Sequence, residues 1–154
     1  MKNVEIAVVG AGLAGQITAL ALGRAGRSVA LIAPKTDRMD KRTTALMDQS
    51  IRFLSRLGLW SQIEPSAAKL STMQIIDGTD RLLRAPTVAF RSSEIGLSAF
   101  GWNMSNETLN HALGEAISKE SNIELIDASA QDIEIDETEA ESRFRMASKS
   151  RPAS

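Results

Sequence analysis

Residues 4–34 read VEIAVVGAGLAGQITALALGRAGRSVALIAP, and this stretch decides the fold. Val4–Val9 is short, apolar and rich in β-branched residues, which is typical of a strand buried on both faces. From Leu13 the apolar residues recur at helical spacing until Gly26, and Ser28–Ala33 has the character of a second strand. A strand, a helix and another strand in this order predict a βαβ unit with two parallel strands.

A glycine-rich loop separates the first predicted strand from the helix, and it reads GxGxxG. In a dinucleotide-binding βαβ unit the first glycine allows a sharp turn, the second lets a diphosphate approach the backbone, and the third lets the helix pack close to the strand. The N–H groups of the first helical turn then face the phosphates, and the helix dipole adds about 0.3–1 kcal/mol. The alternative is a turn that serves packing alone. We predict that the diphosphate is bound by six residues: Gly10, Ala11, Gly12, Leu13, Ala14 and Gly15.

One element of such a site is missing. A dinucleotide site usually has an acidic residue at the end of the second strand, where it binds a ribose hydroxyl. This chain has Ala33 and Pro34 there, and neither side chain can accept a hydrogen bond. Asp37 and Asp40 follow in the loop and either substitute for the missing acid or are solvated loop residues. The motif by itself therefore does not distinguish NAD from FAD.

Composition and charge exclude several other classes of function. The chain has 154 residues, of which 43% are hydrophobic, and a net charge of −1, so we expect one globular domain or part of a larger one and no binding of nucleic acid. The absence of cysteine excludes disulfides, cysteine–zinc sites and thiol catalysis, and a single histidine excludes a His-rich metal site. The uncharged stretch Ile6–Gly23 is interrupted by glycines and polar residues, so we interpret it as neither a membrane span nor a signal peptide. We expect a cytoplasmic protein.

The middle of the chain alternates helical and strand patterns. Thr43 or Thr44 is placed to cap a helix that runs to about Leu57 and stops at Gly58. We then expect a strand, a tight turn and an antiparallel return strand, followed by a loop: Leu70–Ile76, Asp77-Gly78, Arg81–Phe90 and Gly96–Gly101.

The last third has one clear helix. Ser105 or Asn106 is placed to cap it, and its apolar stripe consists of Leu109, Ala112, Leu113, Ala116 and Ile117. A strand at Ile123–Ile126 follows, and then a hairpin of Gln131–Ile135 and Ser142–Met146. We therefore predict an α/β fold, a Rossmann-like βαβ unit with a parallel sheet plus antiparallel hairpins. We expect the FAD- or NAD-binding part to span residues 1–147 and residues 148–154 to form a flexible tail.

Other polar and aromatic residues have structural interpretations. His111 lies off the apolar stripe, so we expect it on the surface, and Trp60 and Trp102 are expected to pack. The hairpin arginines Arg81, Arg84 and Arg91 either face water or contact an anionic lipid surface. The acids between Asp132 and Glu141 resemble a solvated turn rather than a metal site, and the chain offers no catalytic acid–base pair.

Several segments after the βαβ unit resemble a known family. They are RTTAL at Arg42–Leu46, SIRFL at Ser50–Leu54, LGLW at Leu57–Trp60, and FGWNMSN at Phe100–Asn106. In this order they resemble the early part of the FAD-dependent aromatic hydroxylases of the p-hydroxybenzoate hydroxylase class, and most of all the polyprenyl-phenol hydroxylases of ubiquinone biosynthesis. The resemblance runs from about Val4 to about Ile126.

The resemblance implies roles for individual residues. The GxGxxG loop would bind the FAD diphosphate, Arg42 and Thr43 would reach the cofactor's phosphates or ribose, and Asn106 would lie near its flavin side. A guanidinium suits phosphate because its planar fork stays charged. From the residues alone, Arg42 could instead be a surface arginine and Asn106 only a helix cap. The implied reaction is hydroxylation of a phenol ring by O2, with NAD(P)H as the reductant of FAD.

The family's later motifs do not appear after Ile126. These are a DG segment and a GD motif whose acid binds the ribityl chain of the flavin. We therefore expect an N-terminal piece of a longer protein, with an incomplete sheet that exposes an edge through which the chain could associate. FAD binding should be weak or absent, with no turnover. The alternatives are a self-contained NAD- or FAD-binding module without catalytic activity, or a fragment without a role of its own.

Overall fold

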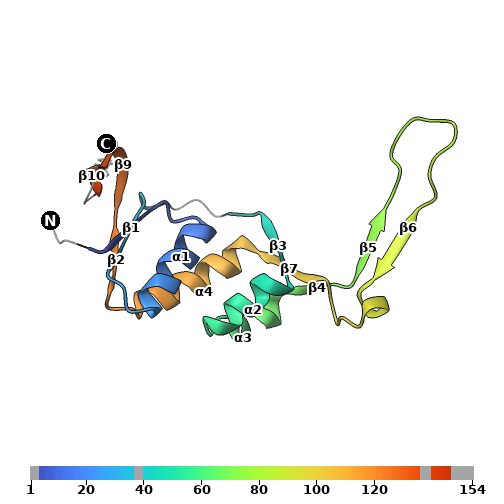
Figure 1. The fold of residues 1–154 in the computed structure, drawn as a ribbon, viewed down its shortest axis with the longest axis horizontal. Coiled ribbons are helices and arrows are strands. Elements are labelled where there is room, and N and C mark those ends of the chain that lie inside the picture. The colour runs from blue at the N-terminus through green and yellow to red at the C-terminus, as the bar shows by residue number, and fades with distance from the viewer. Residues whose placement is uncertain (1–3, 37–39, 136–139, 147–154) are drawn as a thin grey trace, which may run out of the picture. The chain divides into compact units, whose positions relative to one another are not determined.

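The computed structural model describes residues 4–36, 40–135 and 140–146. The chain divides into two compact units (Figure 1). Unit 1 comprises Met1–Asp40 and Asn110–Ser154, and unit 2 comprises Lys41–Leu109. We describe the two units separately.

Unit 1 contains the predicted βαβ unit. Strand β1 (Ile6–Val9), helix α1 (Leu13–Arg24) and strand β2 (Val29–Ile32) follow one another, and β2 pairs in parallel with both β1 and β8 (Ile123–Ile126). The strand order is β1-β2-β8. All four residues of the central strand β2 are buried, as its continuous apolar sequence predicts. The predicted α/β fold with a parallel sheet and antiparallel pairs is confirmed.

Helix α1 ends where the sequence places its stop signal. Gly26 has a φ of +81°, which a residue with a side chain rarely adopts, and its N–H donates to the Gly23 carbonyl at 2.9 Å. The Asn122 side chain donates to the same carbonyl, at 2.7 Å. A Cβ at Gly23 would lie 2.6 Å from the Ile123 side chain, so this glycine lets α1 pack closely against β8.

Helix α4 (Asn106–Ser118) carries the predicted apolar stripe, and every residue of the stripe is buried. Strands β9 (Ala128–Ile135) and β10 (Ala140–Met146) form the predicted antiparallel hairpin. Ala128, at the start of β9, is fully buried against β2 residues Ala30 and Ile32. The expected tail at 148–154 lies outside the described residues, as does most of the acidic turn.

Unit 2 is built on an antiparallel sheet of three strands in the order β3-β7-β4. They are β3 (Thr43–Met47), β7 (Gly101–Ser105) and β4 (Ala68–Leu70). Helix α2 (Asp48–Arg56), helix α3 (Trp60–Ile63) and the 3-10 turn η1 (Glu64–Ser66) connect β3 to β4. Strands β5 (Thr72–Ile75) and β6 (Val88–Arg91) form a separate antiparallel pair, and the 3-10 turn η2 (Ser92–Ile95) follows.

The prediction that Thr43 or Thr44 caps a helix is wrong. Thr43–Met47 is strand β3, and α2 begins only at Asp48. Thr44 and Leu46 are half-buried while their neighbours are exposed, which is the alternation of a strand with one covered face. The pairing partner is β7, more than fifty residues away, so the local pattern gave no sign of it. The predicted stop at Gly58 is confirmed, with φ +65°.

Three further boundaries differ from the prediction. The single strand expected at Leu70–Ile76 is divided between β4 and β5, which belong to different sheets. The hairpin is confirmed, but residues 76–87 connect its strands, in place of a two-residue turn. The Asp77 carboxylate accepts the backbone N–H groups of Thr79 and Ala85, both at 3.0 Å, and so closes this longer loop. Gly101, expected in a loop, begins β7.

Candidate cofactor-binding site

The glycine loop leaves β1 through a turn that depends on glycine. Gly10 has a φ of +104°, and its N–H donates to the Ile32 carbonyl of β2 at 2.8 Å. A Cβ at Gly15 would lie 1.9 Å from the Gly10 carbonyl oxygen. The first and third glycines of the motif therefore make the turn and the close packing of α1 that the sequence predicts.

The middle glycine faces open space. Gly12 is the N-cap of α1, with φ −68° and ψ 174°, and an added Cβ would meet nothing within 4 Å. No side chain caps this helix. The first-turn N–H groups are thus left for another acceptor, because they have no partner inside a helix. This arrangement suits a bound anion.

One side chain holds the loop in place. The Gln16 amide donates from Nε2 to the Ala11 carbonyl at 2.9 Å and to Asn110 Oδ1 of α4 at 2.8 Å. These two bonds tie the glycine loop to the helix beside it in unit 1. Our sequence reasoning missed both Gln16 and Asn110. The available signal was a polar residue inside the otherwise apolar stretch that forms α1.

The carboxyl edge of the parallel sheet carries one carboxylate that sequence reasoning also missed. Asp127 follows β8 directly, and its Oδ1 accepts the backbone N–H of Lys35 at 2.8 Å. Of the two candidates for the missing acid, Asp37 lies outside the described residues and Asp40 is half-buried.

Unit 2 groups the other predicted site residues. Thr43 lies opposite Ser105 where β3 begins and β7 ends, so Arg42 and Asn106 are at the same end of this strand pair. The Asn106 N–H donates to the Arg42 carbonyl at 2.9 Å. The Asn106 side chain is buried and accepts a hydrogen bond from the Thr44 hydroxyl. These contacts show which residues lie together, and the cofactor roles of Arg42, Thr43 and Asn106 stay predictions.

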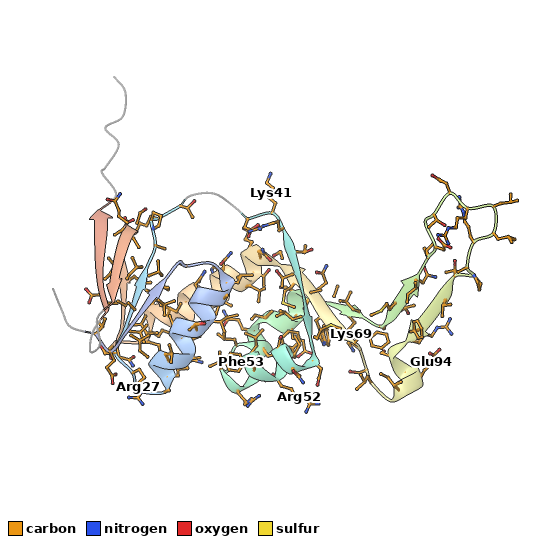
Figure 2. The ribbon with its side chains drawn as sticks, turned by 45° about the horizontal axis from the view of Figure 1, so that its top comes forward. Arg27, Lys41, Arg52, Phe53, Lys69 and Glu94 are labelled. Carbon is orange, nitrogen blue, oxygen red and sulfur yellow. The ribbon has the colours of Figure 1, made fainter. Side chains whose placement is uncertain are left out.

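Asn106 is not the cap of its helix. Ser105 Oγ accepts the N–H of Thr108, three residues later, which is the geometry of an N-cap. The other candidates have mostly the expected surroundings. His111 is exposed, 4.0 Å from Glu115. Trp60 packs edge-to-face on Trp102 at 5.2 Å, with the Lys69 ammonium over the Trp102 ring (Lys69 is labelled in Figure 2). Arg81, Arg84 and Arg91 are exposed, and their contact with lipid stays a prediction.

The described part of the chain has no group of three or more acidic or histidine residues that could hold a metal ion. None of its helices is long and apolar enough to cross a bilayer. Hydrogen bonding lowers the pKa of two carboxyl groups. These belong to Glu5, at the opposite end of β1 from the glycine loop, and Asp77, in the β5–β6 loop. Neither is part of the candidate site.

Residues 3–145 match the model of the FAD binding domain family. The chain belongs to this family. A comparison with curated protein sequences gives no significant match.

Solved structures with a fold similar to that of this FAD binding domain include monooxygenases and an oxygenase. A p-nitrophenol 4-monooxygenase from Pseudomonas putida has a TM-score of 0.77 and 20% identity, over 96% of this chain and 38% of its own. The flavin-dependent monooxygenase PieE, solved with FAD and substrate, has a TM-score of 0.72 and 21% identity, over 92% and 26%. A 2-methyl-3-hydroxypyridine-5-carboxylic acid oxygenase has a TM-score of 0.61 and 19% identity, over 84% and 33%. The chain thus spans about a quarter to two fifths of their lengths.

The glycine loop of the FAD binding domain fits the family's cofactor. Gly10 makes the turn, Gly12 leaves the space that a side chain would fill, and the first turn of α1 offers N–H groups without a capping side chain. A diphosphate needs these features, because its oxygens must approach the backbone closely. FAD is therefore the cofactor of this domain.

Proposed function

We propose that this FAD binding domain is the cofactor-holding part of a flavin-dependent monooxygenase that hydroxylates a polyprenyl-phenol type of substrate in ubiquinone biosynthesis. The glycine loop is the observation that carries the proposal, because Gly12 lies in open space at an uncapped helix start. The family match and the monooxygenase fold support the reaction class. The substrate class rests on the resemblance of RTTAL and FGWNMSN, at Arg42–Leu46 and Phe100–Asn106, to the ubiquinone hydroxylases.

In this proposal, two groups of residues bind different parts of the cofactor. Gly10–Gly15 holds the diphosphate through backbone N–H groups, while Arg42 and Thr43 bind phosphate or ribose oxygens and Asn106 binds nearer the flavin. Bound FAD, reduced by NAD(P)H, would supply the oxygen activation that ring hydroxylation needs. The chain's own contribution is to bind and orient, and we assign no acid–base step to any of its residues.

We further propose that this chain by itself binds FAD weakly and does not hydroxylate. The support is that the chain spans only 26–38% of the length of the three similar monooxygenases. Purified chain should be mixed with excess FAD and passed through gel filtration. We expect no retained yellow flavin spectrum, a melting temperature raised by at most roughly 1 °C, and no FAD-dependent oxidation of NADPH.

Tight binding would give a different result. A ligand present at a hundred times its Kd stabilises a protein by about 2.7 kcal/mol, which raises the melting temperature of a chain of this size by roughly 5–11 °C. A shift of that size with FAD, on a monodisperse sample, would contradict the proposed weak binding of FAD. A shift of that size with either FAD or NAD would favour a self-contained nucleotide-binding module. The same measurement with NAD shows which of the two cofactors the chain binds.

A further inference from the structure

The ends of three parallel strands form one continuous edge in unit 1. Gly10 follows β1, Ala33 follows β2 and Asp127 follows β8. Backbone hydrogen bonds connect each strand end to the next: the Gly10 N–H donates to the Ile32 carbonyl at 2.8 Å, and the Ala33 N–H donates to the Ile126 carbonyl at 3.1 Å. Neighbouring strands lie about 4.8 Å apart, so Asp127 is one strand beyond the end of β2.

The Asp127 carboxylate is held in a fixed place at this edge. Its Oδ1 accepts the backbone N–H of Lys35, in the loop that leaves β2. The side chain is exposed, and Oδ2 accepts no hydrogen bond from any residue within the described ranges. One oxygen thus anchors the group beside the end of β2, and the other remains available to a ligand.

A ligand bound at the glycine loop extends along this edge. With the diphosphate at the end of β1, the adenosine of a dinucleotide lies over the end of β2, where a ribose hydroxyl needs an acceptor. Ala33 and Pro34 offer no side-chain acceptor there. A carboxylate from the adjoining strand can serve instead, because the register places residue 127 next to residues 33–35.

We infer that Asp127 accepts a hydrogen bond from the adenosine ribose of the cofactor and replaces the acid missing after β2. This inference rests on the proposed function, since it presupposes a diphosphate at Gly10–Gly15. Asp127 acts as a binding residue that selects a ribose with its hydroxyls in place, and the Lys35 bond orients it.

NMR chemical-shift titration of the 154-residue chain tests the inference, because it measures weak affinities. The ligands are ADP, 2′-deoxy-ADP and 3′-deoxy-ADP. We expect the wild-type chain to bind ADP roughly tenfold more tightly than at least one deoxy analogue, since a hydrogen bond to a charged group is lost. In Asp127→Ala the affinity for ADP should fall roughly tenfold and the preference over the deoxy analogue should disappear.

Two further variants separate binding from folding. Asp127→Asn can still accept from the Lys35 N–H without the charge, so it should keep the melting temperature and lose part of the preference for ADP. Glu124→Ala removes an exposed carboxylate from β8, the strand that precedes Asp127, and we expect this variant to bind ADP as tightly as the wild type does. Both spectra also report whether the sheet has stayed folded.

Each outcome bears on one of the two claims. If Asp127→Ala keeps both the ADP affinity and the preference for the ribose hydroxyl, the inference is wrong and Asp127 only anchors Lys35. If the wild-type chain shifts with ADP and Gly12→Val does not, the proposed diphosphate site stands whatever Asp127 does. A wild-type chain that shows no shift at any ADP concentration overturns the inference, because the chain then holds no diphosphate ligand whose ribose Asp127 could contact.

Discussion

The three glycines of the motif are required for different reasons. Gly10 needs its positive φ, and Gly15 needs its missing side chain because the Gly10 carbonyl oxygen occupies that space. Gly12 has neither constraint, since its φ of −68° suits any residue and its surroundings are open. The fold therefore does not explain a glycine at position 12. A ligand that must approach the backbone does explain it.

The close contact at Gly15 predicts a loss of stability in Gly15→Ala. The Cβ would lie 1.9 Å from a backbone oxygen, so α1 or the loop must shift, at a cost of about 1–3 kcal/mol. Gly114→Ala is the matched control, because Gly114 lies in α4 with nothing within 4 Å of an added Cβ. The control should gain about 0.5–1 kcal/mol from helix propensity. Urea unfolding measures both, and a similar gain in the two variants would contradict the close packing.

At the scale of elements, prediction succeeded where the signal is local. The β1-α1-β2 unit and the α4 stripe follow from strand composition, helical spacing and the stop at Gly26, all within one element or its neighbour. The sequence-based prediction was wrong at β3, because Thr43–Met47 becomes a strand only by pairing with β7. A threonine pair before a helical pattern is equally compatible with a cap, so the sequence alone favoured the wrong choice.

The residues of the candidate site also differ in how far the sequence predicts them. The local motif identifies the six loop residues, whereas the proximity of Arg42 to Asn106 depends on the β3–β7 register. Asp127 was missed for the same reason, since its place beside Lys35 follows from the pairing of β8 with β2. Register between distant strands is set by the whole sheet, and no window of the sequence contains it.

The start of α4 predicts the effect of removing its cap. Ser105 Oγ accepts the Thr108 N–H at 3.1 Å, so Ser105→Ala should cost about 1 kcal/mol of the free energy of unfolding. Ser118→Ala provides the comparison, because this serine lies in the last turn and only donates to the Glu115 carbonyl. That variant should stay within about 0.5 kcal/mol of the wild type. Equal effects in thermal melts of the two variants would mean that Ser105 is not the cap.

At the scale of the whole molecule, the part of the chain that the structure describes has a carboxyl group in each unit whose pKa is lowered by folding: the exposed Glu5 in unit 1 and the half-buried Asp77 in unit 2. In unit 1, the Ser28 N–H donates to the Glu5 carboxylate at 2.8 Å, and the Arg27 side chain pairs with the same carboxylate (Arg27 is labelled in Figure 2). Both contacts lower the pKa of Glu5, the Ser28 hydrogen bond most, and both connect the start of β1 to the start of β2. In unit 2, the N–H of Ala85 and then Thr79 lower the pKa of Asp77. A carboxyl with a lowered pKa stabilises the folded state above its unfolded pKa, and the contribution disappears as pH falls through the folded pKa.

The chain should therefore lose stability on acidification, and Glu5→Gln should isolate one part of that loss. The glutamine keeps an oxygen for the Ser28 N–H but has no charge to titrate. We expect the melting temperature of the wild type to exceed that of Glu5→Gln near pH 7, and the difference to shrink towards zero as pH falls below the ordinary carboxyl range, since the wild-type Glu5 is then protonated. Glu124→Gln changes an exposed carboxylate without a hydrogen bond from a described residue and serves as the control, and its melting temperature near pH 7 should stay close to that of the wild type. A difference between the wild type and Glu5→Gln that stays constant from pH 7 to pH 3 would show that Glu5 acts through packing rather than through its charge.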